Sequence, residues 1–232
     1  MKAEKIGKKK LPWVKILGWI LFLSLVASVV FAAYKVVVTP ENPVDGVQGE
    51  RLRSDYVLML VQCTAGAVVM FLPGLLAKKL RIDVPNYIFV LYFVFLYCAI
   101  YLGEVRSFYY LVPHWDTMLH GFSAVMLGAL GFSLVSILND ANNVEVRLKP
   151  AFVALFAFCF ALTVGALWEI YEFTFDGVLG LNMQKFRLET GEDLVGRAAL
   201  ADTMKDIIVD AAGALLVSVI GALTIKKKRE QK

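Results

Sequence analysis

Long apolar blocks separated by short polar segments dominate the pattern of this chain. The blocks cover approximately residues 11–38, 55–77, 84–103, 116–138, 150–175 and 203–225. Each is close to the roughly 20 residues that an α-helix needs to cross about 30 Å of hydrocarbon. A helix also satisfies its own backbone hydrogen bonds in lipid. The pattern therefore predicts an all-α polytopic membrane protein with about six transmembrane helices.

Composition supports a single integral membrane domain over residues 1–232. Hydrophobic residues make up 59% of the chain, against roughly 45–50% in soluble domains. The blocks divide the domain into a two-helix N-terminal part (1–83), a four-helix part (84–225) and a basic cytoplasmic tail (226–232). The first block is too long for the apolar region of a signal peptide, which spans about 7–15 residues, so we interpret it as a retained anchor.

The basic residues indicate an orientation for these helices. Lys and Arg cluster in the N-terminal tail, at 78–81, near 147–149 and in the C-terminal tail. The positive-inside rule then predicts that both termini are cytoplasmic. The net charge of +4 does not point to nucleic acid, because the basic residues lie at the predicted membrane edges and not on a soluble module.

Three carboxylates follow one another at the start of the sixth block. Asp202, Asp206 and Asp210 are four residues apart, so they share one face of a helix. A charge near the bilayer centre costs from roughly 2.5 to more than 10 kcal/mol, and such residues normally face a protein interior or a wet cavity. This acidic stripe therefore needs partners elsewhere in the chain.

The fourth and fifth blocks supply polar residues at the same predicted depth. Asp116 and His120 lie four apart at the start of the fourth block, and Glu169, Glu172 and Asp176 share one face near the end of the fifth. At 1.5 Å per residue, His120, Glu169, Asp206 and Asp210 all lie roughly 6–12 Å inside the predicted outer membrane boundary. We expect His120, Glu169, Asp206 and Asp210 to converge on a single outward-facing pocket.

Carboxylates held together in a low-dielectric site repel one another, so they require protonation or a cation. Lys205 is the one basic side chain inside this region, with Arg106, Arg187 and Arg197 in the adjoining loops. These do not balance the acids, whereas a divalent metal would. Oxygen ligands with one imidazole, His120, or with a second from His114 suit Mg²⁺, Mn²⁺ or Ca²⁺, or a mixed site for Zn²⁺ or Fe²⁺. The expected metal ligands are Asp116, His120, Glu169, Glu172, Asp202, Asp206 and Asp210, with His120 and Glu169 as catalytic acid or base.

One loop segment and one repeated tripeptide each have more than one interpretation. The segment 176–193 mixes apolar with polar residues, which is compatible with a lid, a segment on the membrane surface or a solvated connector. The sequence Asp-Thr-Met occurs at 116–118 and again at 202–204. A parallel repeat would explain this, but so would the preference of helix N-termini for Asp and Thr, which we favour.

The motifs around these acids resemble those of a family of bacterial inner-membrane proteins of uncharacterised function, the YjdF type, and more distantly of VanZ-like membrane proteins. The resemblance rests on W-D-T-M-L-H-G-F at 115–122, L-W-E-I-Y-E at 167–172 and A-D-T-M-K-D-I-I-V-D-A-A-G-A-L at 201–215. It implies a multi-pass protein of the bacterial plasma membrane. It also points to six residues of this chain, namely Asp116, His120, Glu169, Asp202, Thr203 and Asp206.

The sequence leaves three functions open. A metal-dependent hydrolase or transferase would act on a lipid-linked or cell-envelope substrate. A cation- or proton-coupled transporter would use the acids as carriers, although the inner halves of the last three helices are nearly apolar. A non-catalytic scaffold would use them for packing or for a partner. The chain has no G-x-S-x-G, P-loop, H-E-x-x-H or G-x-G-x-x-G motif, and its oligomeric state is not indicated.

Overall fold

The computed structural model describes residues 12–40, 51–80, 84–141, 148–188 and 192–231, and these residues are mainly helical. Six helical segments are long and apolar enough to cross a membrane: Trp13–Val38, Arg53–Lys79, Asn86–Val105, Trp115–Val135, Pro150–Leu179 and Arg197–Lys227. The described residues form no extended strand, and their β-type pairing is one isolated bridge between Arg187 and Asp193. The predicted all-α membrane fold with about six transmembrane helices is confirmed.

The chain forms two compact units, Met1–Pro113 and His114–Lys232. The first three membrane-spanning segments belong to unit 1 and the last three to unit 2. The third segment packs against the first two, although the sequence-based subdivision grouped it with the last three. Every residue of the predicted polar site lies in unit 2.

Unit 1 is built from α1 (Pro12–Val38), α2 (Arg53–Val69), α3 (Leu72–Leu80), α4 (Asn86–Leu96), the π-helix η1 (Tyr97–Val105) and α5 (Phe108–Leu111). Its apolar core includes Leu21, Leu25, Met59 and Cys63. Arg51 closes the end of η1 by donating hydrogen bonds to the backbone carbonyls of Glu104 and Val105 and to the side chain of Ser107. Because terminal helical carbonyls lack partners within the helix, this arginine acts as a C-terminal cap.

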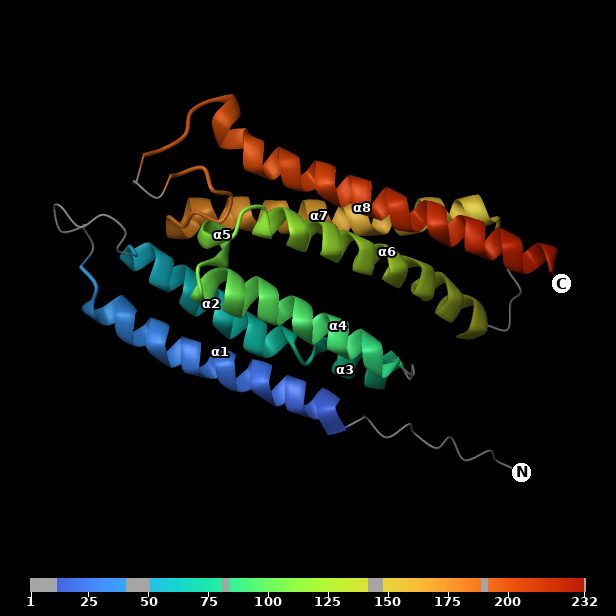
Figure 1. The fold of residues 1–232 in the computed structure, drawn as a ribbon, viewed down its shortest axis with the longest axis horizontal. Helices are drawn as coiled ribbons and strands as arrows, with labels where there is room; N and C mark the ends of the chain where they lie inside the picture. The colour runs from blue at the N-terminus through green and yellow to red at the C-terminus, as the bar shows by residue number, and fades with distance from the viewer. Residues whose placement is uncertain (1–11, 41–50, 81–83, 142–147, 189–191, 232) are drawn as a thin grey trace. The chain divides into compact units, whose positions relative to one another are not determined.

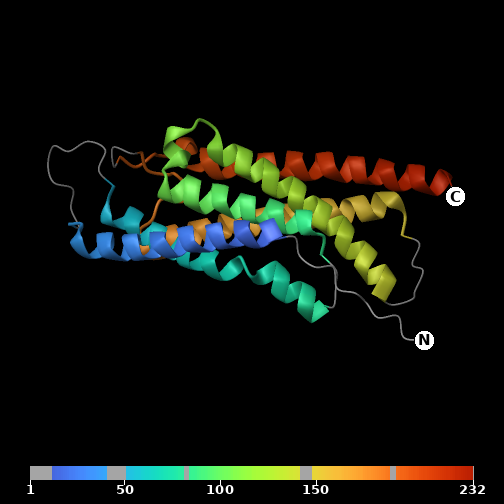
Figure 2. The same ribbon diagram turned by 60° about the horizontal axis from the view of Figure 1, so that its bottom comes forward.

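Unit 2 contains α6 (Trp115–Ala141), α7 (Pro150–Leu179) and α8 (Arg197–Glu230), and each of the three packs against the other two. The helices run side by side (Figure 1 and Figure 2). Small residues allow this close approach, which is typical of membrane helices. A Cβ added to Gly131 would lie 2.8 Å from the Ala157 Cα, and one added to Gly213 would lie 3.0 Å from the Ala124 Cβ.

The first residues of α6 and α8 and the last residues of α7 lie at the same end of unit 2 (Figure 1). We call this end of unit 2 the acidic end. The helix α8 starts at Arg197, earlier than the predicted 203, so Asp202 lies in its second turn. Asp202 is therefore not an N-terminal cap, and the interpretation of Asp-Thr as a shared capping signal is wrong for α8. Asp116 does lie in the first turn of α6.

The orientation of the helices is a prediction from the lysine and arginine distribution. In a variant without the native cysteines, Val195→Cys should react with a membrane-impermeant maleimide in intact cells, because this 84% exposed residue precedes α8 at the acidic end. The exposed Gln231→Cys should react only after permeabilisation. The reverse labelling pattern would invert the orientation.

Candidate metal centre

His120 lies at the centre of the polar residues of unit 2. Its ring projects from the second turn of α6, where it is 7% exposed. Four carboxylates approach it: Asp116 from α6, Glu169 from α7, and Asp206 and Asp210 from α8. The expected convergence of His120, Glu169, Asp206 and Asp210 is thus present, because the periodicity of each helix turns these residues toward the shared interior of unit 2.

The two ring nitrogens of His120 have different surroundings. Nδ1 lies 3.4 Å from Asp210 Oδ2. A carboxylate can only accept a hydrogen bond, so this contact calls for a proton on Nδ1. In the neutral imidazole, Nε2 then carries the free lone pair. An imidazole held by a carboxylate in this way is the usual arrangement of a histidine that ligates a metal.

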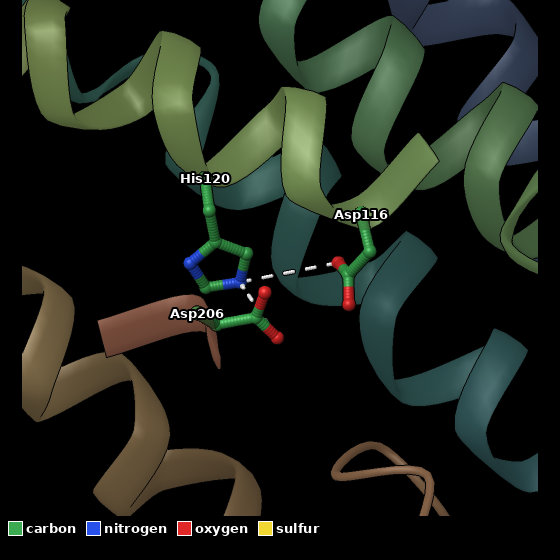
Figure 3. Close-up of side chains that lie close together, drawn as sticks. All are labelled: Asp116, His120 and Asp206. Carbon is green, nitrogen blue, oxygen red and sulfur yellow. Dashed lines mark ion pairs between the residues drawn. The ribbon is translucent and has the colours of Figure 1, made fainter. Parts of the chain in front are cut away.

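Nε2 faces three carboxylates, one from each helix. It lies 3.9 Å from Asp116 Oδ1, 3.8 Å from Glu169 Oε1 and 4.0 Å from Asp206 Oδ2. Figure 3 shows the carboxylates of Asp116 and Asp206 on the same side of the imidazole, each joined to Nε2 by a dashed line. In a tetrahedral site with ligands at about 2.1 Å, the donor atoms are about 3.4 Å apart. The observed spacing is therefore slightly wider than that of a closed metal site.

Several buried carboxylate oxygens have no hydrogen-bond partner among the described residues. They are both oxygens of Glu169, Oδ1 of Asp206 and Oδ1 of Asp210. The three residues are only 4%, 2% and 2% exposed. An uncompensated buried polar atom costs roughly 1–3 kcal/mol, and more if it is charged, so these oxygens require a proton or a cation.

The donor atoms of Asp116, His120 and Asp206 all lie within 4.8 Å of one another. Small shifts of these side chains would let all three reach one ion. Glu169 Oε1 faces the same nitrogen of His120 and is placed either as a fourth ligand or as a base beside the ion. The residues present therefore fit a divalent metal.

A basic residue that the sequence analysis did not assign to the site, Lys185, reaches it. Its ammonium group donates to Asp116 Oδ2 and lies 3.4 Å from Asp202 Oδ2. Burial lowers the pKa of Lys185, but Asp116 and Asp202 act in the opposite direction and leave the pKa above its ordinary value. Lys185 therefore remains charged at neutral pH.

Lys185 belongs to residues 181–188, which follow α7 and which we call the strap. Asp176 holds the strap by accepting hydrogen bonds from the backbone N–H groups of Met183 and Gln184, at 2.8 and 2.9 Å. The Gln184 side chain donates to Thr203 Oγ1 at 2.8 Å. Lys185 itself has a positive φ of 50°, a conformation that is uncommon outside glycine. These hydrogen bonds hold the strap against the helices and place Lys185 beside Asp116 and Asp202.

For residues 181–188 of the segment 176–193, the strap packs on the helices of unit 2. Leu181 and Met183 are buried, whereas Asn182 and Gln184 between and beyond them are half-buried and hydrogen-bonded. The segment is not a strand, because Met183 and Gln184 form a turn that is followed by Lys185 with its positive φ. The apolar Leu181 and Met183 were the signal in the sequence that part of this segment is buried, but they did not specify its path.

The other predicted residues lie at the margin of the cluster. Asp202 contacts Lys185, and no ion pair joins it to His120 among the described residues. Glu172 accepts a hydrogen bond from Trp168 Nε1 at 2.9 Å. The expected counter-charge Lys205 is exposed. Arg187 pairs with Asp193 at 2.7 Å, Arg197 is exposed, and Arg106 belongs to unit 1.

Gly165 makes room for this arrangement. A Cβ at this position of α7 would overlap the carboxylate of Asp210. Asp210 in turn contacts His120. The absence of a side chain at 165 is therefore what allows Asp210 to lie between α7 and α8 beside the imidazole.

Comparisons with known proteins place the chain among membrane proteins. A family model described as "Predicted membrane protein (DUF2238)" matches residues 16–227. An uncharacterized protein of Thermotoga maritima is 29% identical over 120 residues, which are 51% of this chain and 53% of that protein. The match thus spans about half the length of this curated relative. No solved structure matches the chain.

We expect Gly165→Ala to displace Asp210 and to destabilise unit 2. Overpacking of this kind typically costs about 1–3 kcal/mol, and thermal unfolding of the purified protein in detergent measures the loss. The control is Gly177→Ala on the same helix, where an added Cβ meets nothing within 4 Å. Equal melting temperatures for the two variants would contradict this expectation, because the Asp210 carboxylate could then adopt another position without loss of stability.

Proposed function

The chain belongs to the DUF2238 family of predicted membrane proteins, and we propose that it binds a divalent cation through Asp116, His120 and Asp206. One observation carries this proposal. The buried imidazole contacts Asp210 through Nδ1 and turns Nε2 toward carboxylates that include unpaired oxygens. A cation between these groups would satisfy the lone pair and the carboxylates together.

The charge of the cluster favours a divalent ion. Four carboxylates lie within 4.0 Å of the imidazole, and Lys185 is the described cation that contacts one of them. Hard oxygen ligands with one imidazole suit Mn²⁺ and Zn²⁺, as well as Mg²⁺ or Ca²⁺ with additional waters. The proposed ligand set contains no thiolate, so a soft metal is not favoured.

The reaction that we propose is hydrolysis or group transfer. Three protein ligands leave positions at the metal for water or substrate, as in catalytic zinc sites. A bound ion would lower the pKa of water and polarise a phosphate or ester oxygen. Glu169, whose Oε1 lies 3.8 Å from Nε2, is the base in this scheme.

The proposed substrate is a lipid or a lipid-linked molecule of the cell envelope. The support is the position of the site, which is formed by three membrane-spanning segments near the ends of α6 and α7. A YjdF-type assignment and a place in the bacterial inner membrane, both suggested by the sequence motifs, are parts of the same proposal. Catalysis would then occur at one face of the bilayer.

The distribution of buried polar groups favours a localised site over a transport route. Among the described residues of unit 2, the buried polar or charged ones are His120, Glu169, Asp176, Asp206, Asp210 and Ser218. Ser218 alone lies beyond Asp210 toward the other end of α8. Transported ions or protons would need further polar groups along that path.

We expect divalent cations to stabilise the protein against heat. A ligand that binds only the folded state contributes RT ln(1 + [L]/Kd), about 2.7 kcal/mol at one hundred times Kd. Thermal melts in detergent with Mg²⁺, Mn²⁺, Ca²⁺ or Zn²⁺ should therefore exceed the melt in excess chelator for at least one ion. Metal analysis after purification without chelator should find the same ion.

The variants His120→Ala and Asp206→Asn should lose this cation-dependent stabilisation. The matched control is Glu230→Gln, which neutralises an exposed acid near the other end of α8 that pairs with Lys226 at 3.9 Å. Asp206→Asn keeps the shape of the side chain, so it separates loss of binding from loss of folding. Identical melts of the wild-type protein in all five conditions would contradict the proposal.

A further inference from the structure

We propose that Lys185 is a built-in competitor of the divalent cation and sets the affinity of the site. This inference rests on the proposed function. Without a cation, the Lys185 ammonium group neutralises part of the charge of Asp116 and Asp202. A cation that binds to Asp116 would be repelled by the Lys185 ammonium group, which the strap holds at the same carboxylate.

Asp116 connects the two positive charges. Its Oδ1 lies 3.9 Å from His120 Nε2, on the side of the proposed ion, and its Oδ2 accepts the hydrogen bond from Lys185. One carboxylate thus separates the ammonium group from the ion, a distance of roughly 6 Å or less. Asp202, 3.4 Å from the same ammonium group, helps to keep it there.

Two effects of Lys185 on cation binding have opposite signs. By orienting Asp116 it would raise the affinity, and changes to such outer contacts typically cost 10–100-fold. By repulsion it lowers the affinity: at about 6 Å, even with the dielectric constant of water, a unit charge and a divalent ion repel by about tenfold in Kd. The Lys185 side chain is only 24% exposed, so screening is weaker than in water and repulsion is the larger effect.

The strap keeps Lys185 in this position. Its anchors are Asp176, which accepts two strap N–H groups, and Thr203, which accepts from Gln184. Because coupling between two binding events is reciprocal, a change that loosens the strap must strengthen cation binding. Gln184→Ala removes one anchor without changing any charge, which separates the role of the strap from that of the lysine.

The test measures Mn²⁺ affinity on the full-length protein in detergent, with free Mn²⁺ followed by electron paramagnetic resonance. Lys185→Met should bind Mn²⁺ at least tenfold more tightly than the wild-type protein, and Gln184→Ala several-fold more tightly. The control is Lys205→Met, which removes an equal charge from an exposed position on α8. Solvent screens that charge, so Kd should change less than threefold.

The outcomes separate this inference from the proposed function. If the wild-type protein binds Mn²⁺ and Lys185→Met binds equally or more weakly, the competitor role is wrong and orientation of Asp116 prevails. If neither protein binds Mn²⁺, and the thermal melts show no stabilisation by Mg²⁺, Ca²⁺ or Zn²⁺, the metal site itself is wrong. An equal gain in Lys185→Met and Lys205→Met would also overturn the proposal, because a general charge effect would then suffice.

Discussion

Carboxylates packed around one imidazole inside a bundle of membrane helices repel one another strongly unless positive charge or protons lie between them. Asp116, Glu169, Asp206 and Asp210 all approach His120 to within 4.0 Å. In a low-dielectric environment this repulsion is weakly screened. The contacts of unit 2 at its acidic end follow from the need to balance that charge.

The structure supplies part of the balance through its own chain. The strap turns back after α7 and brings Lys185 to Asp116 and Asp202, while Asp210 contacts the Nδ1 side of the imidazole. Among the described residues, Oδ1 of Asp206 and Oδ1 of Asp210 are buried without a hydrogen-bond partner. Three carboxylates face Nε2, and this arrangement is the basis of our proposal that the site binds a cation.

Close packing of the three helices makes this concentration possible. Gly165 leaves the space that the Asp210 carboxylate occupies, and Gly213 lets α8 approach Ala124 of α6. Small residues draw membrane helices together through van der Waals contact. The apolar contacts along the bundle therefore offset the cost of holding the acids together at one end.

The sequence by itself determined the helices and the set of acids. Blocks of about 20 apolar residues can cross the hydrocarbon only as helices, and spacings of four residues place side chains on one face regardless of the tertiary fold. These two local rules sufficed to group His120, Glu169, Asp206 and Asp210, and the structure brings these residues together.

Tertiary structure alone decided which cation reaches the acids and which acids face the imidazole. Lys205 lies beside Asp206 in sequence, yet its side chain is exposed, whereas Lys185 reaches the cluster through the strap. Because α8 begins at Arg197, Asp202 lies in its second turn, at the margin of the site, and not at the predicted cap position. The sequence could not specify these features, because they depend on how a connecting segment folds over the helix ends, and neither helical periodicity nor hydropathy constrains that path.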